Sequence, residues 1–161
     1  MRILIPTLTT LIFSTITLAD SGYYEAVLGG SAADLFTVDV QNGSATAGKL
    51  SGVLTITKSS GGPFKLGHHS LFDCALMVEK IKDGTNLKGR CTTTDSSSGD
   101  QLYSHNDRKV GDTSSGSGGA GTSTFVGGTG KYKDIKGSCE YTVSYLPNKR
   151  VAAVNKCNWT R

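Results

Sequence analysis

The runs SCEYTVSYL (138–146) and RVAAVNKCNW (150–159) flank the turn residues PNK (147–149). Both runs are rich in the aromatic and β-branched residues that favour strands. A hairpin centred on Asn148 pairs residues whose numbers sum to 296, and Cys139 and Cys157 meet that sum. Because the Cβ atoms of directly opposed residues lie ~4.5–5.5 Å apart or closer, such a pair can form a disulfide. This stretch therefore predicts a β-hairpin cross-linked by Cys139–Cys157.

The other two cysteines flank a second turn, at Asp83-Gly84, between strand-like runs at 70–82 and 87–94. A turn centred between Asp83 and Gly84 gives a pairing sum of 167, whereas Cys74 and Cys91 sum to 165. The two cysteines would then be two positions out of register, and a β-bulge or a shifted turn would bring them together. We predict a Cys74–Cys91 disulfide on this basis.

The rest of the chain also has the pattern of an all-β protein. Alternating apolar runs occur between turn residues such as Asn42-Gly43, and hardly any segment has helical periodicity. Further strands are expected at 23–28, which ends at Gly29-Gly30, and at 35–40, 53–57 and 101–105. Residues 111–123 (GDTSSGSGGAGTS) contain almost only Gly, Ser and Thr and are predicted to be a flexible loop.

The N-terminal residues are typical of a secretory signal peptide. Arg2 precedes an uncharged apolar stretch at 3–18, and Thr17-Leu18-Ala19 fits a cleavage site before Asp20. Residues 1–19 are therefore expected to be removed, which leaves a single β domain at 20–161. An exported chain meets an oxidising compartment, so the predicted location is secreted or periplasmic. In a eukaryotic source, Asn42 and Asn158 would match the glycosylation pattern.

Charge is concentrated at the C-terminal end. The chain has a formal net charge of +4, and residues 131–161 contain seven Lys and Arg against two acidic residues. This end could bind an anionic surface through Lys149, Arg150 and Lys156, or it could be an ordinary solvated strand face. No nucleic-acid partner and no membrane span beyond the signal peptide are predicted.

No motif identifies a reaction. The run GGTGKY (127–132) lacks the earlier glycine and the Ser or Thr of a phosphate-binding loop, so a tight turn is expected there. His68 or His69 could form a metal site with His105 and a nearby aspartate, but surface histidines are the more ordinary interpretation. No Gly-x-Ser-x-Gly elbow occurs after residue 19. We therefore predict no catalytic residues, no metal and no cofactor.

Two stretches resemble a known family. The first stretch is Cys91-Thr-Thr-Thr-Asp95 with Gly99-Asp-Gln-Leu-Tyr-Ser104, and the second is Phe125-Val-Gly-Gly-Thr-Gly-Lys-Tyr132 with Ile135-Lys-Gly-Ser138. They are similar to motifs of bacterial exported proteins related to allene oxide cyclase-like and dirigent-like barrels. The resemblance covers about residues 70–145. It implies a closed antiparallel barrel of about eight strands, with a turn or short helix at the Gly-Thr-Gly-Lys segment. No catalytic residue of the plant enzymes can be matched to this chain.

Three functions follow as hypotheses. The first is a non-enzymatic exported barrel that holds a small apolar ligand, because barrels of about eight strands enclose either packed side chains or one small molecule. The inward residues would be Phe36, Leu54, Ile56, Phe72, Leu76 and Tyr141. The second is an isomerase or cyclase like the plant enzymes. The third is a surface interaction protein that uses the basic C-terminal hairpin. A solid core is as compatible with the sequence as a cavity.

Overall fold

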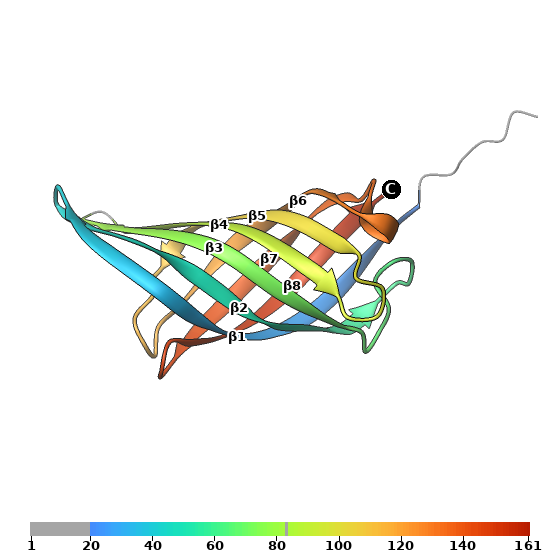
Figure 1. Ribbon diagram of the computed structural model, residues 1–161, viewed down its shortest axis with the longest axis horizontal. Coiled ribbons are helices and arrows are strands. Elements are labelled where there is room, and N and C mark those ends of the chain that lie inside the picture. Colours follow the sequence, from blue (N-terminus) through green and yellow to red (C-terminus); the bar gives the residue numbers. More distant parts are fainter. Residues whose placement is uncertain (1–19, 83) are drawn as a thin grey trace, which may run out of the picture.

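The computed structural model describes residues 20–82 and 84–161 and shows a single closed barrel (Figure 1). The predicted signal peptide lies outside the described residues. Eight strands follow one another around the barrel, each antiparallel to its neighbours, and β1 closes against β8. They are β1 (Ser21–Val40), β2 (Gly43–Ser59), β3 (His69–Ile81), β4 (Gly84–Asp95), β5 (Gln101–Gly111), β6 (Gly118–Gly128), β7 (Lys136–Leu146) and β8 (Arg150–Thr160). A short 3-10 helix, η1 (Gly130–Tyr132), precedes β7. No helix in the described part of the chain is long and apolar enough to cross a membrane.

The predicted fold class is confirmed, and so is the C-terminal hairpin. Strands β7 and β8 pair with a sum of 296 along their whole length, which places Cys139 directly opposite Cys157. The two form a disulfide, and both side chains are buried inside the barrel. The segment after Thr129 forms η1, in agreement with the expected turn or short helix.

The register of β3 with β4 corrects the predicted turn at Asp83-Gly84. Ile81 pairs with Gly84, so paired residues sum to 165 and Gly84 is the first residue of β4. The turn therefore lies one position earlier than predicted, with no bulge between these strands. Cys74 and Cys91 become direct partners as a result, and their predicted disulfide is present.

Strand β1 is continuous, whereas the sequence predicted that a strand would end at Gly29-Gly30. Gly30 faces the interior beside Gly52 of β2, and the ring of Phe72 packs against both. A Cβ atom on Gly30 would lie 2.8 Å from Phe72 Cζ, and one on Gly52 would lie 2.1 Å from the carbonyl oxygen of Gly29. Because neither residue has a side chain, the backbones of β1 and β2 and the ring of Phe72 can approach one another closely here. The glycines therefore serve packing within a continuous strand and do not mark its end.

The predicted inward position of Phe36 is wrong. Asp34 has a φ of +53°, and the register of β1 with β2 shifts by one residue between Ala33 and Phe36. Such a bulge inserts one residue, which reverses the alternation of side chains beyond it. Leu35 therefore faces the interior side, and Phe36 points outward with 68% of its surface exposed.

The prediction of a flexible loop at 111–123 is also wrong for its second half. Only residues 112–117 connect β5 to β6, because β6 begins at Gly118. Gly121 pairs with Tyr141, and a Cβ atom at 121 would lie 2.6 Å from the Tyr141 ring. The small residues of β6 thus make room for a large aromatic side chain from the neighbouring strand, a cross-strand arrangement that stabilises glycine in sheets.

One end of the barrel is closed by aromatic residues. Phe64, in the segment between β2 and β3, stacks on Tyr24 with ring centroids 4.2 Å apart and contacts Tyr132 and Trp159 at 5.4 and 5.9 Å. These four side chains are almost completely buried. This end therefore has a packed apolar core, and any interior space must lie nearer the middle or the other end.

Candidate functional site

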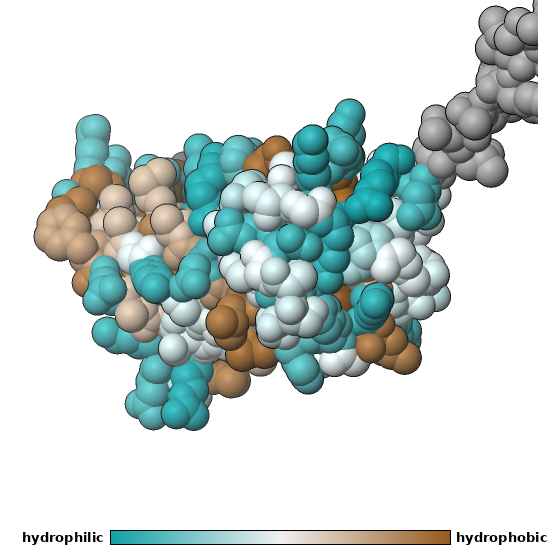
Figure 2. Space-filling model, turned by 45° about the vertical axis from the view of Figure 1, so that its right-hand side comes forward, coloured by the Kyte–Doolittle hydropathy of each residue, from teal (hydrophilic) through white to brown (hydrophobic). Residues whose placement is uncertain are grey.

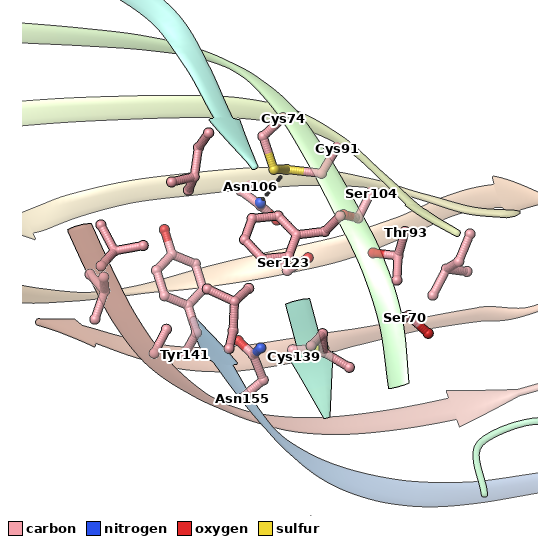
Figure 3. A pocket seen from close by; sticks show the side chains of 18 of the residues that line it. Ser70, Cys74, Cys91, Thr93, Ser104, Asn106, Ser123, Cys139, Tyr141 and Asn155 are labelled. Carbon is pink, nitrogen blue, oxygen red and sulfur yellow. Dashed lines mark hydrogen bonds between the residues drawn. A yellow bond between two sulfur atoms is a disulfide. The ribbon is translucent and has the colours of Figure 1, made fainter. Parts of the chain in front are cut away.

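The middle of the barrel encloses a cavity of about 140 Å³ (Figure 3). Its wall is mainly apolar, with a few polar side chains from separate strands. The predicted inward residues Leu54, Ile56, Phe72, Leu76 and Tyr141 all line it, whereas Phe36 does not. Ligand pockets in proteins commonly combine an apolar wall with few polar groups. The polar lining residues include Ser70, Thr93, Ser104, Asn106, Ser123 and Asn155, which sequence reasoning did not single out.

Four tyrosines line the cavity, and burial keeps the hydroxyl groups of two of them, Tyr24 and Tyr141, protonated. Burial raises the pKa of Tyr24 above its ordinary value of about 10. Burial also raises the pKa of Tyr141 to about 12, although the nearby Arg108 opposes that shift. Both phenols are therefore neutral hydrogen-bonding groups at neutral pH. Among the described residues that line this cavity, none is Asp, Glu or His.

A second, wider hollow of about 460 Å³ opens at the end opposite the aromatic core. We call it the mouth. Its wall includes Leu35, Thr37 and Val78 together with the residues Lys80, Lys149 and Arg150. None of the described residues that line the mouth is acidic. Lys80 forms an ion pair with Asp112 at 2.8 Å, and Arg150 lies on the same outward-facing side of β8 as the exposed Ala152. Of the three cationic residues that border the mouth, Lys149 is therefore the one that is neither ion-paired within the described residues nor on the outer face of the barrel.

Arg108 packs beside Tyr145, near where the inner cavity meets the mouth, although it is not itself among the residues that line either space. Tyr145 and Val151 line both spaces, and the Arg108 guanidinium carbon is 5.2 Å from the centre of the Tyr145 ring. The Arg108 residue is only 2% exposed. None of its three side-chain nitrogens makes a hydrogen bond of good geometry with a described residue. Burial raises the pKa of the Tyr145 phenol, and Arg108 lies near enough to that hydroxyl group to oppose the rise. A buried arginine without a counter-ion is costly, so it stands out as a functional candidate.

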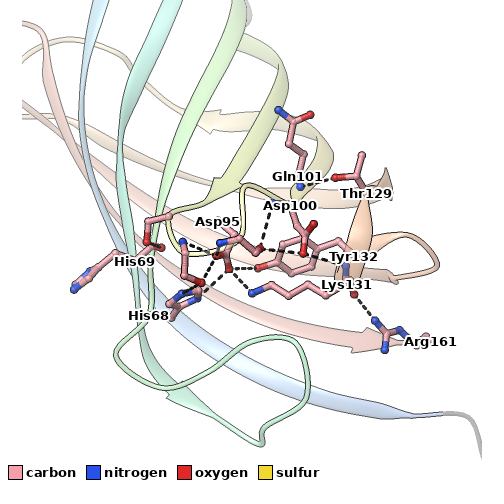
Figure 4. A network of polar contacts seen from close by, with 12 residues as sticks. His68, His69, Asp95, Asp100, Gln101, Thr129, Lys131, Tyr132 and Arg161 are labelled. Atoms are coloured by element: carbon pink, nitrogen blue, oxygen red, sulfur yellow. Dashed lines mark hydrogen bonds and ion pairs between the residues drawn. The ribbon is translucent and has the colours of Figure 1, made fainter.

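A polar cluster beside the closed end surrounds Asp95, whose side chain is completely buried (Figure 4). Its Oδ1 atom accepts hydrogen bonds from the backbone N–H groups of Ser97 and Ser98 at 2.8 and 2.9 Å. Its Oδ2 atom pairs with Lys131 and accepts a hydrogen bond from Tyr132. Burial alone would raise the pKa of Asp95, but Lys131 and the serine donors outweigh it and hold that pKa well below its usual range.

The same cluster brings a serine, a histidine and an aspartate into the order of a hydrolytic triad. His68 Nδ1 is 3.1 Å from Asp95 Oδ2, and His68 Nε2 is 3.1 Å from Ser97 Oγ. However, Ser97 Oγ is closer to Asp95 Oδ1, at 2.7 Å, so its proton is directed toward the carboxylate. The backbone N–H groups that could stabilise an oxyanion already donate to Asp95. We therefore assign this cluster to fixing the loop between β4 and β5.

The structure separates the other candidate residues. His69 hydrogen-bonds to Thr55, while His68 contacts Asp95. No group of three or more potential metal-ligating side chains occurs within the described residues. Lys149 and Arg150 line the mouth, but Lys156 lies further along β8 in register with Glu25 and Glu140. The face shown in Figure 2 has apolar residues interspersed with hydrophilic ones.

Comparison with known proteins identifies no family for this chain. No protein-family model matches the sequence, and a search of curated proteins finds no significant relative.

Proposed function

We propose that this protein is an exported, disulfide-linked barrel that binds a small, mainly apolar molecule without transforming it. The single observation that carries the proposal is the inner cavity of about 140 Å³. An apolar cavity of about 150 Å³ is large enough to accept benzene, so the inner cavity suits an apolar group of about six carbons. The sequence resemblance to exported allene oxide cyclase-like barrels is consistent with this proposal.

The export component of the proposal rests on the N-terminal sequence and on the cysteines. All four cysteines are paired, in two disulfides. Disulfides of this kind persist in oxidising compartments and are rare in a reducing cytosol. Secretion or a periplasmic location is therefore the environment that best suits the folded domain.

An isomerase or cyclase is the second candidate, favoured by the hydroxyl groups of Tyr24 and Tyr141 at the inner cavity. A buried neutral phenol can donate a hydrogen bond to a ligand oxygen. Because burial raises both pKa values, neither phenol is suited to remove a proton at neutral pH. With no carboxylate or imidazole among the described lining residues, binding is the better-supported function.

A surface role for the basic hairpin has less support. Arg150 and Lys156 are six positions apart on β8, which corresponds to roughly 20 Å along a strand. Lys156 is opposite Glu25 and Glu140 in the two neighbouring strands, so acidic residues adjoin it on both sides. The three cations therefore do not form one patch, since Lys149 and Arg150 lie at the mouth end of the barrel and Lys156 lies well away from it.

Replacement of Ala153 by leucine tests the proposed binding site. Ala153 lines the inner cavity, whereas its neighbour Ala152 on β8 is exposed on the outer face. We expect A153L to abolish binding of 4-phenylbutan-1-ol, measured by isothermal titration calorimetry, and to stabilise the fold by about 1 kcal/mol because it fills the cavity. The matched control A152L should bind like the wild type and change stability by less than about 0.5 kcal/mol.

Two results would count against the proposal. If the wild type binds no neutral apolar probe, the barrel does not function as an apolar binding site. If A153L binds the probe as well as A152L does, the ligand does not occupy the inner cavity.

A further inference from the structure

Arg108 supplies a charge that nothing described in the barrel interior neutralises. Its guanidinium is buried, none of its nitrogens makes a hydrogen bond of good geometry within the described chain, and it stacks over Tyr145. Stacking on an aromatic ring offsets only part of the cost of removing a guanidinium from water. The protein therefore retains an energetically costly buried charge beside Tyr145, which lines both the inner cavity and the mouth.

The neighbouring carboxylates do not serve as its counter-ion. Asp107 precedes Arg108 on β5 and is exposed, on the opposite side of the strand. Asp112 is bound by Lys80 at 2.8 Å and accepts hydrogen bonds from Thr113 and Ser114. No ion pair joins Arg108 to a carboxylate within the described residues. No described carboxylate is therefore paired with the Arg108 guanidinium, which packs against a ring that borders both spaces.

The mouth is suited to admit such an anion. Lys149 and Arg150 line it, and no described lining residue is acidic. A concave opening lined by one sign of charge raises the local concentration of oppositely charged ligands. Asn106 precedes Arg108 by two residues on β5 and so faces the same side of the strand, and it lines the inner cavity together with Tyr141 (Figure 3).

We propose that the ligand is a small organic anion, with an anionic group bound by Arg108 and an apolar body in the inner cavity. This inference rests on the proposed binding function and specifies the chemical class of the ligand. A planar guanidinium pairs bidentately with a carboxylate or a phosphate, and such charge-assisted hydrogen bonds are stronger than neutral ones. The apolar end enters first through the mouth, and the anionic end remains beside Arg108, on the side of the cavity that opens toward the mouth and Lys149.

Three probes that share one apolar skeleton test the charge preference: 4-phenylbutyrate, 4-phenylbutan-1-ol and 4-phenylbutylamine. We expect calorimetry to show that the wild type binds the acid at least about tenfold more tightly than the alcohol, and the amine more weakly than either. Arg108→Met should bind acid and alcohol equally while retaining the alcohol affinity of the wild type. The control Arg90→Met, at an exposed arginine of β4, should behave like the wild type.

Arg108→Met should also melt at a higher temperature than the wild type, because it removes an unpaired buried charge. An arginine that only stabilised the fold would lower the melting temperature when replaced. Preference of the wild type for the acid, together with a higher melting temperature of Arg108→Met, therefore indicates that Arg108 serves ligand binding. The inference is overturned if the wild type binds the alcohol as tightly as the acid, or if Arg108→Met keeps the preference for the acid. If the wild type binds the alcohol without preference for the acid, the proposed apolar binding function still holds and only the anionic ligand class is wrong. If the wild type binds none of the three probes, both the binding function and the ligand class are wrong.

Discussion

Replacing Asp95 by asparagine is expected to destabilise the fold by about 3 kcal/mol at neutral pH, measured by urea unfolding. The Asp95 carboxylate is fully buried and pairs with Lys131, which is itself only partly exposed. Removing one member of a buried ion pair leaves the other uncompensated, which typically costs about 3–5 kcal/mol. Asparagine can still accept the backbone hydrogen bonds of Ser97 and Ser98, so we expect the lower end of that range.

The same substitution should change how stability depends on pH. Because the folded-state pKa of Asp95 lies below its unfolded value of about 4, ionised Asp95 stabilises the fold fully above about pH 4. That contribution is lost as the pH falls from there toward the folded-state pKa. The melting temperature of Asp95→Asn should therefore fall less between pH 4 and pH 2 than that of the wild type.

Asp73→Asn provides a matched control for this experiment. Asp73 forms an ion pair with Lys49 and a hydrogen bond with Ser51, but its side chain is 59% exposed. Exposed pairs contribute about 1 kcal/mol or less, so this variant should be nearly as stable as the wild type. Equal losses of stability for Asp73→Asn and Asp95→Asn would contradict the assignment of the Asp95 cluster as a buried structural centre.

Removing either disulfide by a double cysteine-to-alanine change should cost about 3 kcal/mol. The sequence separations are 17 residues for Cys74–Cys91 and 18 for Cys139–Cys157, and loops of this length correspond to about 3 kcal/mol when the effect is attributed to the entropy of the unfolded chain. Removing both should cost about 6 kcal/mol, which is comparable with the whole stability of many small domains. We therefore expect the quadruple variant to be largely unfolded at 37 °C by circular dichroism.

The reduced wild type serves as a control without mutation, since it should match the quadruple variant once both bridges are broken. A loss below about 1 kcal/mol for each double variant would show that pairing across β3–β4 and β7–β8 holds these strands without covalent help. Such a result would also weaken the case for an oxidising compartment as the protein's environment.

Structural features that depend on neighbouring residues alone could be predicted from the sequence. The hairpin at Asn148 was predictable because the turn and two cysteines fixed a single register. Phe36 was misplaced because alternation was assumed to continue through Asp34, whose positive φ marks a bulge that no local residue pattern announced. Residues 118–123 appeared loop-like because their stability as a strand depends on the ring of Tyr141 from β7.

The candidate site depends on contacts between distant residues, so little of it could be predicted. Five inward residues followed from alternation within strands. Arg108 resembled any charged residue of a solvated strand, and its burial follows only from closure of the barrel. The Asp95 cluster likewise joins Asp95 to side chains up to 37 residues away in sequence, which no motif spacing suggested.

The central claim is that a ligand occupies the interior of this barrel with its charge at Arg108. The most direct test is the crystal structure of the oxidised protein grown with 4-phenylbutyrate. Our account predicts electron density for the phenyl ring in the inner cavity and a carboxylate within hydrogen-bonding distance of the Arg108 guanidinium. A barrel interior filled by its own side chains, with the probe absent or bound on the outer surface, would contradict it.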